Sequence, residues 1–432
     1  MRKLLISFLL FTGYVFFNGC RSAEIKTGSV IFIHPDGTGL STWNAARLLY
    51  YGPDDELNWD KLSNIGLYRS HPADAMSTTS NAGATIHAYG IKANTGDYGL
   101  INGKIITARS GKKLSIMKEA QASGMNIGIV NSGNIVEPGT GVFVASELSR
   151  DMDEEIAEKI VQSGADVILS GGEEWLIPVD ERGVHGKGKR KDGKNLIKEA
   201  ELAGYYIVFN KNELLNIPEN VTRLLGVFAL NHTFSSKSEE DAIKSGLLNF
   251  YMNAPSVSEM TEAAIKILSK NDQQFFLVVE EEATDNFANK NNANGTLEAL
   301  KRADDAIGVA LNYYAEHPNT LIITAADSEA GGMEIIGDTI DKMNPNENLN
   351  ETDSNGAPWD GVNGTGTKPF MTKPDKFDNS FPFAIAWSTT SDTYGSVVAK
   401  AEGLNAELLK GSIDNTEIYR IMYATLFGRI LD

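Results

Sequence analysis

Acidic side chains follow several apolar runs of this chain, at points where buried strands would end. One acid after a strand is ordinary turn chemistry. Several acids would repel one another if the strands are parallel neighbours, because parallel strands present their carboxyl ends at one edge of a sheet. Bound cations relieve such repulsion, so the pattern predicts a metal site. The acids are Asp36, Glu137, Glu280, Asp285, Asp327 and Asp392.

A hydroxyl cluster opens residues 77–96, "STTSNAGATIHAYGIKANTG", and small residues with a helical pattern follow it. Ser80 would stand at the start of that helix, where backbone amides and the helix dipole favour an anion. It could therefore act as a nucleophile beside a bound anion. An N-cap serine ahead of a tightly packed helix explains the same residues, and from this segment alone the cap is the favoured interpretation.

The elements that would position these residues alternate between strand and helix. Near-continuous apolar runs of this length are typical of central parallel strands, and amphipathic helical segments lie between them. We therefore expect an α/β fold in a single large domain, with a long, mostly parallel central sheet between helices. The expected strands are 29–36, 126–133, 166–172, 205–210, 275–282, 320–327 and 383–388, and the expected helices are 154–164, 258–271, 296–317 and 415–428.

The chain has 432 residues and a net charge of −18, which argues against a general nucleic-acid binder. Arg2 and Lys3 precede an apolar run to Phe17, which is typical of a secretory signal and short for a membrane span. Asn18 and Gly19 then lead to Cys20, the one cysteine.

The small residue before Cys20 is similar to a bacterial lipoprotein cleavage site, although a plain signal peptide with an incidental cysteine is the alternative. We expect a signal over 1–19 and a catalytic domain over 20–432. The protein would lie in the bacterial cell envelope, periplasmic or at the surface, and a lipid on Cys20 would be its contact with the membrane.

A long stretch at about 341–379 is rich in Asn, Gly and Asp. It is too long for an ordinary connection, so we expect a surface insertion or a lid. Its acids could hold calcium but lack the EF-hand spacing, which makes a calcium loop the weaker interpretation.

Four segments, in order, resemble the alkaline phosphatase family. Residues 79–99, "TSNAGATIHAYGIKANTGDYG", are similar to its nucleophile segment, and 164–176 resemble its "DVILGGG" segment. Residues 255–285 resemble "PSLAEMTEKAI…FFLMVEG…ID", and "TLIITAADSEAGG" resembles "TLVVVTADHETGG". The resemblance spans roughly 28–428 and implies a single α/β sandwich with a long central sheet.

The resemblance also implies roles for individual residues. Ser80 falls at the position of the phosphoserine nucleophile, with Thr78 and Thr79 as fallbacks if the register shifts. Arg150 falls on the arginine that holds two phosphate oxygens. Asp36 matches an acid that bridges two metals. Glu280 matches a ligand of a third site, which holds magnesium. Glu137 falls at a position of that site where the family has an acid or a histidine, and Thr140 could supply a hydroxyl there.

Three positions that hold histidine in the family differ here. The counterparts are Asn289, Ser328 and Asp392, while Asp285 and Asp327 keep the acids of the same motifs. The six histidines, at 34, 71, 87, 185, 232 and 317, fall outside the family's metal positions, so we expect them on the surface or in the core. Oxygen ligands suit Mg²⁺, Ca²⁺ or Mn²⁺, whereas the family implies Zn²⁺.

We therefore expect metal-dependent hydrolysis of small phosphate monoesters through a phosphoserine on Ser80. The chain lacks histidine at all three of these metal positions but keeps every acid of the same motifs. This pattern favours a working site with a changed metal preference over a site that has lost its function. Two alternatives stay open: a diesterase or another anionic-ester hydrolase on this fold, and a silent phosphate- or cation-binding lipoprotein. A homodimer is compatible with the sequence.

Overall fold

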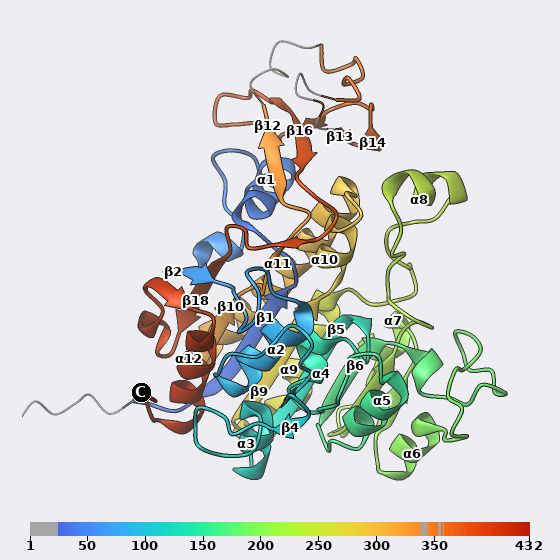
Figure 1. Ribbon diagram of the computed structural model, residues 1–432, viewed down its shortest axis with the longest axis vertical. Coiled ribbons are helices and arrows are strands. Elements are labelled where there is room, and N and C mark those ends of the chain that lie inside the picture. Colours follow the sequence, from blue (N-terminus) through green and yellow to red (C-terminus); the bar gives the residue numbers. More distant parts are fainter. Residues whose placement is uncertain (1–24, 338–343, 353–355, 357) are drawn as a thin grey trace, which may run out of the picture.

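A ten-stranded sheet runs through the centre of the protein (Figure 1). The computed structural model describes residues 25–337, 344–352, 356 and 358–432. Nine of the strands are parallel, and β18 alone runs antiparallel to its neighbours. In sheet order the strands are β19 (Gly411–Asp414), β2 (Asn64–Arg69), β18 (Val398–Gly403), β10 (Thr320–Thr324), β1 (Ser29–Pro35), β9 (Phe275–Glu281), β5 (Asn126–Asn134), β6 (Val167–Gly171), β8 (Leu224–Val227) and β7 (Tyr206–Val208).

Helices cover both faces of this sheet, and the central strands feed two separate cores. Along β1, Val30 and Phe32 pack into one core, and Ile31 and Ile33 pack into the other. This follows from the two-residue period of a strand, whose side chains alternate between faces. The first core includes helices α2 (Ser80–Tyr89), α3 (Ile116–Ala122), α5 (Asp153–Val161), α6 (Leu196–Leu202) and α12 (Thr416–Phe427), and the second includes α1 (Leu40–Tyr50), α7 (Lys211–Leu215), α9 (Val257–Leu268) and α11 (Ala293–Glu316).

The predicted fold class is confirmed: the protein is a single large α/β domain with a mostly parallel central sheet between helices. The expected helices correspond to α5, α9, α11 and α12. The prediction for 205–210 was partly wrong, because β7 is an edge strand on which Tyr206 is 42% exposed.

The prediction for 383–388 as a central strand was wrong. That run is β16 (Pro382–Trp387), which belongs to a second, antiparallel sheet with β12 (Met333–Ile336) and β13 (Trp359–Gly361). A short apolar run predicts that a strand is buried but not which sheet it belongs to, and here the strand is buried within this smaller sheet. The sheet is completed by β14 (Gly364–Thr365) and β15 (Phe370–Met371).

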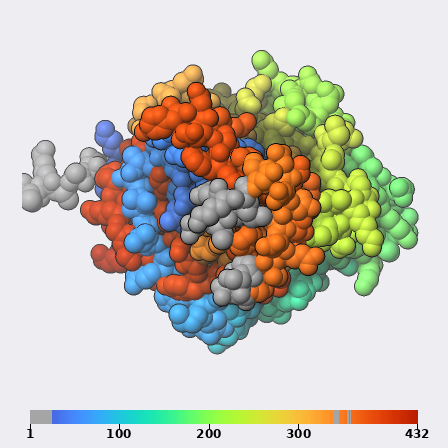
Figure 2. Space-filling view, turned by 90° about the horizontal axis from the view of Figure 1, so that it is seen from above, coloured from blue at the N-terminus to red at the C-terminus, as the bar shows by residue number. Residues whose placement is uncertain are grey.

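The expected surface insertion therefore contributes strands to the second sheet. Seen from above in Figure 2, its described part lies in orange across the middle of that face, beside the yellow-green segment around α8 (Glu239–Ser245). The contact is direct, since the amide of Thr365 donates to Glu240 Oε1 at 3.4 Å.

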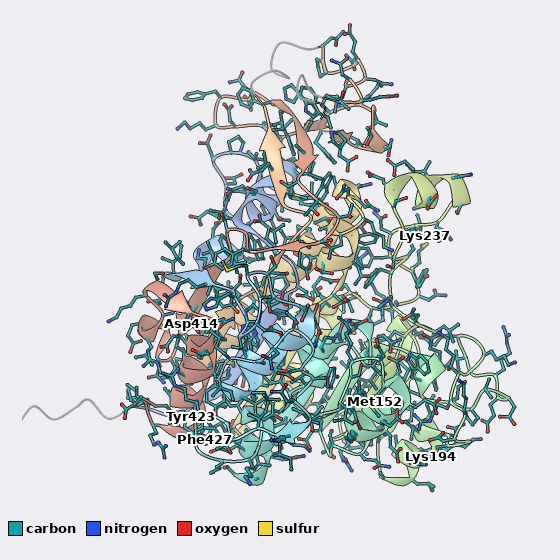
Figure 3. The ribbon with its side chains drawn as sticks, viewed as in Figure 1. Met152, Lys194, Lys237, Asp414, Tyr423 and Phe427 are labelled. Carbon is teal, nitrogen blue, oxygen red and sulfur yellow. The ribbon has the colours of Figure 1, made fainter. Side chains whose placement is uncertain are left out.

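The α8 segment is also tied to the start of α11. The Asn292 side-chain amide donates to the carbonyl of Lys237, labelled in Figure 3, at 3.2 Å. On the other side of the molecule, Tyr423 and Phe427 of α12 pack together, and the Tyr423 hydroxyl donates to Glu119 Oε1 at 2.9 Å. Among the residues that the structure describes, no helix combines the length and the apolar character that crossing a membrane requires.

Candidate functional site

The predicted acids converge where four neighbouring parallel strands end. Asp36 directly follows β1, and Glu280 is the second-last residue of β9. Asp327 lies three residues past β10, and Glu137 lies three residues past β5. Because β10, β1, β9 and β5 are adjacent, their carboxyl ends form one edge of the sheet. Asp36, Glu280 and Asp327 are completely buried there.

Asp36 is the centre of this acidic cluster. One oxygen, Oδ1, accepts from the amide of Gly37 at 2.9 Å and lies 3.2 Å from His34 Nε2. Two groupings of possible metal ligands share Asp36, and within each the ligand atoms lie within 4.8 Å of one another. The first is His34, Asp36 and Glu280, and the second is Asp36, Glu282 and Asp285.

Asp285, Asn289 and Asp392 form a second cluster next to the first. Helix α10 (Ala283–Ala288) supplies Asp285 and, at its C-cap, Asn289, which places the two side chains one turn apart. The Asn289 side-chain amide donates to both Asp285 oxygens at 3.1 Å and to Asp392 at 2.9 Å. Asp392 reaches this place because β17 (Asp392–Thr393) pairs with β11 (Glu329–Ala330), just after Asp327.

Ser80 is the first residue of α2, and the cap position belongs to Thr79. Thr79 makes no side-chain capping bond, since its hydroxyl donates to the carbonyl of Thr95 at 2.8 Å. Helix α2 approaches the acids closely: a Cβ added at Gly83, one turn after Ser80, would lie 2.3 Å from Asp327 Cβ. The first turn of α2 is therefore packed against Asp327, and a helix N-terminus is a place that favours an anion.

Arg150 reaches the acidic cluster at Glu137. Its Nη2 is 3.3 Å from Glu137 Oε2, and its side chain is 45% exposed. His232 approaches the same carboxylate, with Nδ1 at 3.9 Å from Glu137 Oε1. A guanidinium that forms one ion pair and is open to solvent can still donate hydrogen bonds to two oxygens of an entering anion.

Burial and mutual repulsion raise the pKa of most carboxyl groups in the cluster. Burial raises the pKa of Glu280 to about 8, with Asp36 as the main repelling charge. Burial also raises the pKa of Asp285 and Asp327 well above the ordinary value, with repulsion from Asp392 and from Asp36 respectively. Asp36 is the exception, because burial would raise its pKa but His34, and contacts with Asp327 and Ser80, lower it.

This arrangement fits bound cations. Within the described residues, many buried polar atoms of the site have no hydrogen-bond partner, and nearly all of them are oxygens. Buried oxygens of this kind are costly unless a ligand satisfies them. They are Oδ2 of Asp36, both carboxylate oxygens of Asp327, Oγ of Ser328, Oδ1 of Asn289, Oε1 of Glu280 and Oε2 of Glu282.

Sequence reasoning missed two residues of the site, Glu282 and His34. Glu282 stands in the run "EEE" at 280–282, so the sequence shows an acid there but not whether its side chain faces the site. His34 is two residues before Asp36, and the two-residue period of a strand could have placed them on one side. In the register of the sheet, His34 lies directly opposite Glu280.

Comparison with known proteins points to one family. The family model described as "Alkaline phosphatase" matches residues 27–427. The alkaline phosphatase of Gadus morhua is 29% identical over 94% of this chain and 93% of its own length. The membrane-bound alkaline phosphatase of Bombyx mori is 26% identical over 95% of this chain and 82% of its own.

A solved structure shares the fold. The alkaline phosphatase from the Antarctic bacterium TAB5 superimposes with a TM-score of 0.70 at 23% identity, over 94% of this chain and all of that one.

Proposed function

The chain belongs to the alkaline phosphatase family, and on this premise we propose that it hydrolyses phosphate monoesters through a phosphoserine on Ser80. The observation that carries this proposal is the position of Ser80 at the N-terminus of α2, packed against a buried acidic cluster. Several oxygens of that cluster have no hydrogen-bond partner in the described structure. Small phosphate esters are the substrates that such a centre suits.

The residues have distinct tasks in this reaction. Bound divalent cations would supply the positive charge that favours the Ser80 alkoxide and stabilises the leaving oxygen. The Ser80 oxygen attacks phosphorus in line, and the bond to the ester oxygen breaks. Arg150 holds the non-bridging oxygens during the attack. Water then hydrolyses the phosphoserine, which releases inorganic phosphate and restores Ser80.

We assign the cations to three groups of ligands. Asp36 and Asp327 would hold the cation nearest Ser80, and Asp285, Asn289 and Asp392 would hold its catalytic partner. Nearly every ligand atom of this pair is an oxygen, which favours Mg²⁺, Ca²⁺ or Mn²⁺ over the Zn²⁺ typical of the family. Glu280 and Glu137 would hold Mg²⁺ at the third position, with Asp36 shared between sites.

A chromogenic monoester assay with single metals tests the proposal. Activity is expected with at least one of Mg²⁺, Ca²⁺, Mn²⁺ and Zn²⁺, and Ser80→Ala should lose it by roughly a thousandfold or more. Thr79→Ala is the matched control, because it removes the neighbouring hydroxyl and should keep most of the activity. The reverse result would move the nucleophile to Thr79.

The same assay separates the other functions. A diester that turns over faster than the monoester would indicate a phosphodiesterase. No turnover with any of the four metals would indicate a binding protein.

We also propose that the protein is exported and anchored by a lipid on Cys20. The basic residues, apolar run and cysteine within 1–20 support this proposal, and these residues lie outside the described part of the structure. A membrane-bound relative, the alkaline phosphatase of Bombyx mori, is consistent with a location of this protein at a membrane surface. Labelled fatty acid should enter the wild-type protein, while Cys20→Ser should remain unlabelled; equal labelling would refute the anchor.

A further inference from the structure

His34 is a buried histidine whose ring is fixed on both sides. Its Nδ1 lies 2.7 Å from the carbonyl oxygen of Ala325, which can only accept. Nδ1 therefore carries a proton, and in the neutral ring Nε2 has a free lone pair. That lone pair faces the acidic cluster, because Nε2 is 3.2 Å from Asp36 Oδ1.

Two lone pairs at that distance repel unless something positive lies between them. An imidazolium would provide a proton, and although burial lowers the pKa of His34, Asp36 and Glu280 raise it overall. The alignment nevertheless leaves Nε2 without a hydrogen-bond partner among the described residues. A cation coordinated by both atoms is the other solution. Bonds of 2.0–2.1 Å to a tetrahedral metal place neighbouring ligand atoms about 3.3 Å apart, close to the observed separation.

The sheet supplies the third ligand. His34 and Glu280 are opposite each other in the parallel pairing of β1 with β9. Ligand atoms of His34, Asp36 and Glu280 lie within 4.8 Å of one another, and Glu280 Oε1 is buried without a hydrogen-bond partner among the described residues. The other Glu280 oxygen accepts from the Asn131 side chain, which orients the carboxylate.

We propose that His34 Nε2 is a metal ligand, and that with Asp36 and Glu280 it forms a mixed nitrogen–oxygen site for a zinc-type cation. The imidazole that the catalytic pair lacks is thus supplied to the neighbouring third position, which would then take a zinc-type cation in place of the Mg²⁺ that Glu280 and Glu137 alone would hold. The Ala325 carbonyl is the outer contact that fixes the tautomer. This inference shares the metal centre of the proposed function but does not depend on turnover.

Zinc K-edge X-ray absorption tests the proposal on the purified, chelator-treated protein. It is loaded with one equivalent of Zn²⁺ in the presence of excess Mg²⁺. The wild-type spectrum should show imidazole scattering in the zinc shell. His34→Gln should lose that scattering and bind Zn²⁺ roughly a hundredfold more weakly in equilibrium dialysis.

Two control variants separate His34 from other histidines. His317→Gln removes an exposed ring, and His232→Gln removes the imidazole beside Glu137; both should keep the wild-type spectrum. An all-oxygen shell in the wild type would overturn the proposal, and so would imidazole scattering that survives in His34→Gln. The wild-type spectrum decides the matter even if that variant fails to fold.

A Ser80→Ala protein should give the wild-type zinc spectrum. Failure of the phosphatase proposal would therefore appear as absent turnover with intact zinc coordination, whereas failure of the His34 proposal would appear in the spectrum alone.

Discussion

At the scale of single residues, Asn289 is the neutral side chain that we propose as a metal ligand where the family resemblance implies a histidine. Its amide donates to both Asp285 and Asp392, two carboxylates that repel each other. With a cation bound, the same side chain can present Oδ1, the atom now without a hydrogen-bond partner in the described structure.

Asn289→His is expected to shift the metal preference toward zinc, because imidazole suits Zn²⁺ and carboxamide oxygen suits hard cations. The ratio of kcat/KM with Zn²⁺ to that with Mg²⁺ should rise by roughly tenfold or more. Lys290→His is the control, since it adds an imidazole at the next, exposed position. An unchanged ratio in Asn289→His would show that this position does not hold a catalytic cation.

Within the described part of the chain, the Arg150 guanidinium makes one ion pair, with Glu137, and its other donors have no partner there. Arg150→Ala should lower kcat/KM by about 10- to 100-fold, which is the loss expected when a hydrogen bond between charged groups is removed. It should also weaken inhibition by inorganic phosphate. Arg150→Lys should recover only part of the loss, because an ammonium cannot hold two oxygens in one plane. Arg182→Ala, on an exposed loop, should behave as wild type in both measurements. If both Arg150 variants match the wild type, the arginine has no role in binding phosphate.

The sequence could supply the acids of the site but not all of its neighbours. Asp36, Glu280 and Asp327 were predictable because each ends a recognisable apolar run. The contact of His34 with Glu280 depends on β1 lying next to β9, although 246 positions separate the two residues (280 − 34). Pairings at such a distance are fixed by the strand order of the whole sheet, which local patterns do not contain.

At the scale of elements, the close packing of α2 on Asp327 is the feature that sets the position of Ser80. Gly83→Ala would place a methyl group 2.3 Å from Asp327 Cβ, so helix or carboxylate must move. We expect a loss of about 1–3 kcal/mol in unfolding free energy and a larger relative loss in kcat/KM.

Gly96→Ala provides the matched comparison for that prediction. A Cβ at Gly96 meets nothing within 4 Å, and the position is exposed. This variant should keep both its melting temperature and its activity. A fully active and stable Gly83→Ala protein would mean that the spacing of α2 and Asp327 does not matter for the reaction.

Two of the strands that sequence patterns missed, β2 and β19, lie together at one end of the sheet. β2 alternates between buried and exposed residues, with Ile65 and Leu67 more than half exposed, so it lacks a continuous apolar run. β19 is four residues long and pairs with β2 at the edge of the sheet. Long apolar runs identify strands covered on both faces, whereas β2 and β19 are stabilised by pairing with neighbours that are distant in sequence.

At the scale of the whole molecule, the buried acids couple stability to pH and to metals. Burial raises the pKa of Glu281 to about 7 and that of Glu280 to about 8, from an ordinary value of 4.5. The unfolded chain releases these protons at lower pH than the folded one does. Without metals, stability should therefore fall as pH rises from about 4.5 to about 8.

Divalent cations should remove this loss. A cation bound by the carboxylates favours their charged form in the folded state, and at a hundredfold excess over its Kd each site adds about 2.7 kcal/mol. The melting temperature of chelated protein should therefore decrease between pH 5 and pH 8, while that of protein in excess Mg²⁺ should not. Sodium chloride at the same ionic strength controls for screening, which acts weakly on buried charges.

The variant that tests the origin of this behaviour is Asp36→Asn. Asp36 belongs to both groupings of possible ligands and is a main repelling charge on Glu280 and Asp327. Its neutralisation should make the melting temperature of the chelated protein fall less steeply with pH, because Asp36 no longer repels the neighbouring carboxylates. It should also reduce the stabilisation by Mg²⁺, because the same carboxylate would bind the cation. A chelated Asp36→Asn protein that declines as steeply as the wild type would place the pH-sensitive charges elsewhere in the molecule.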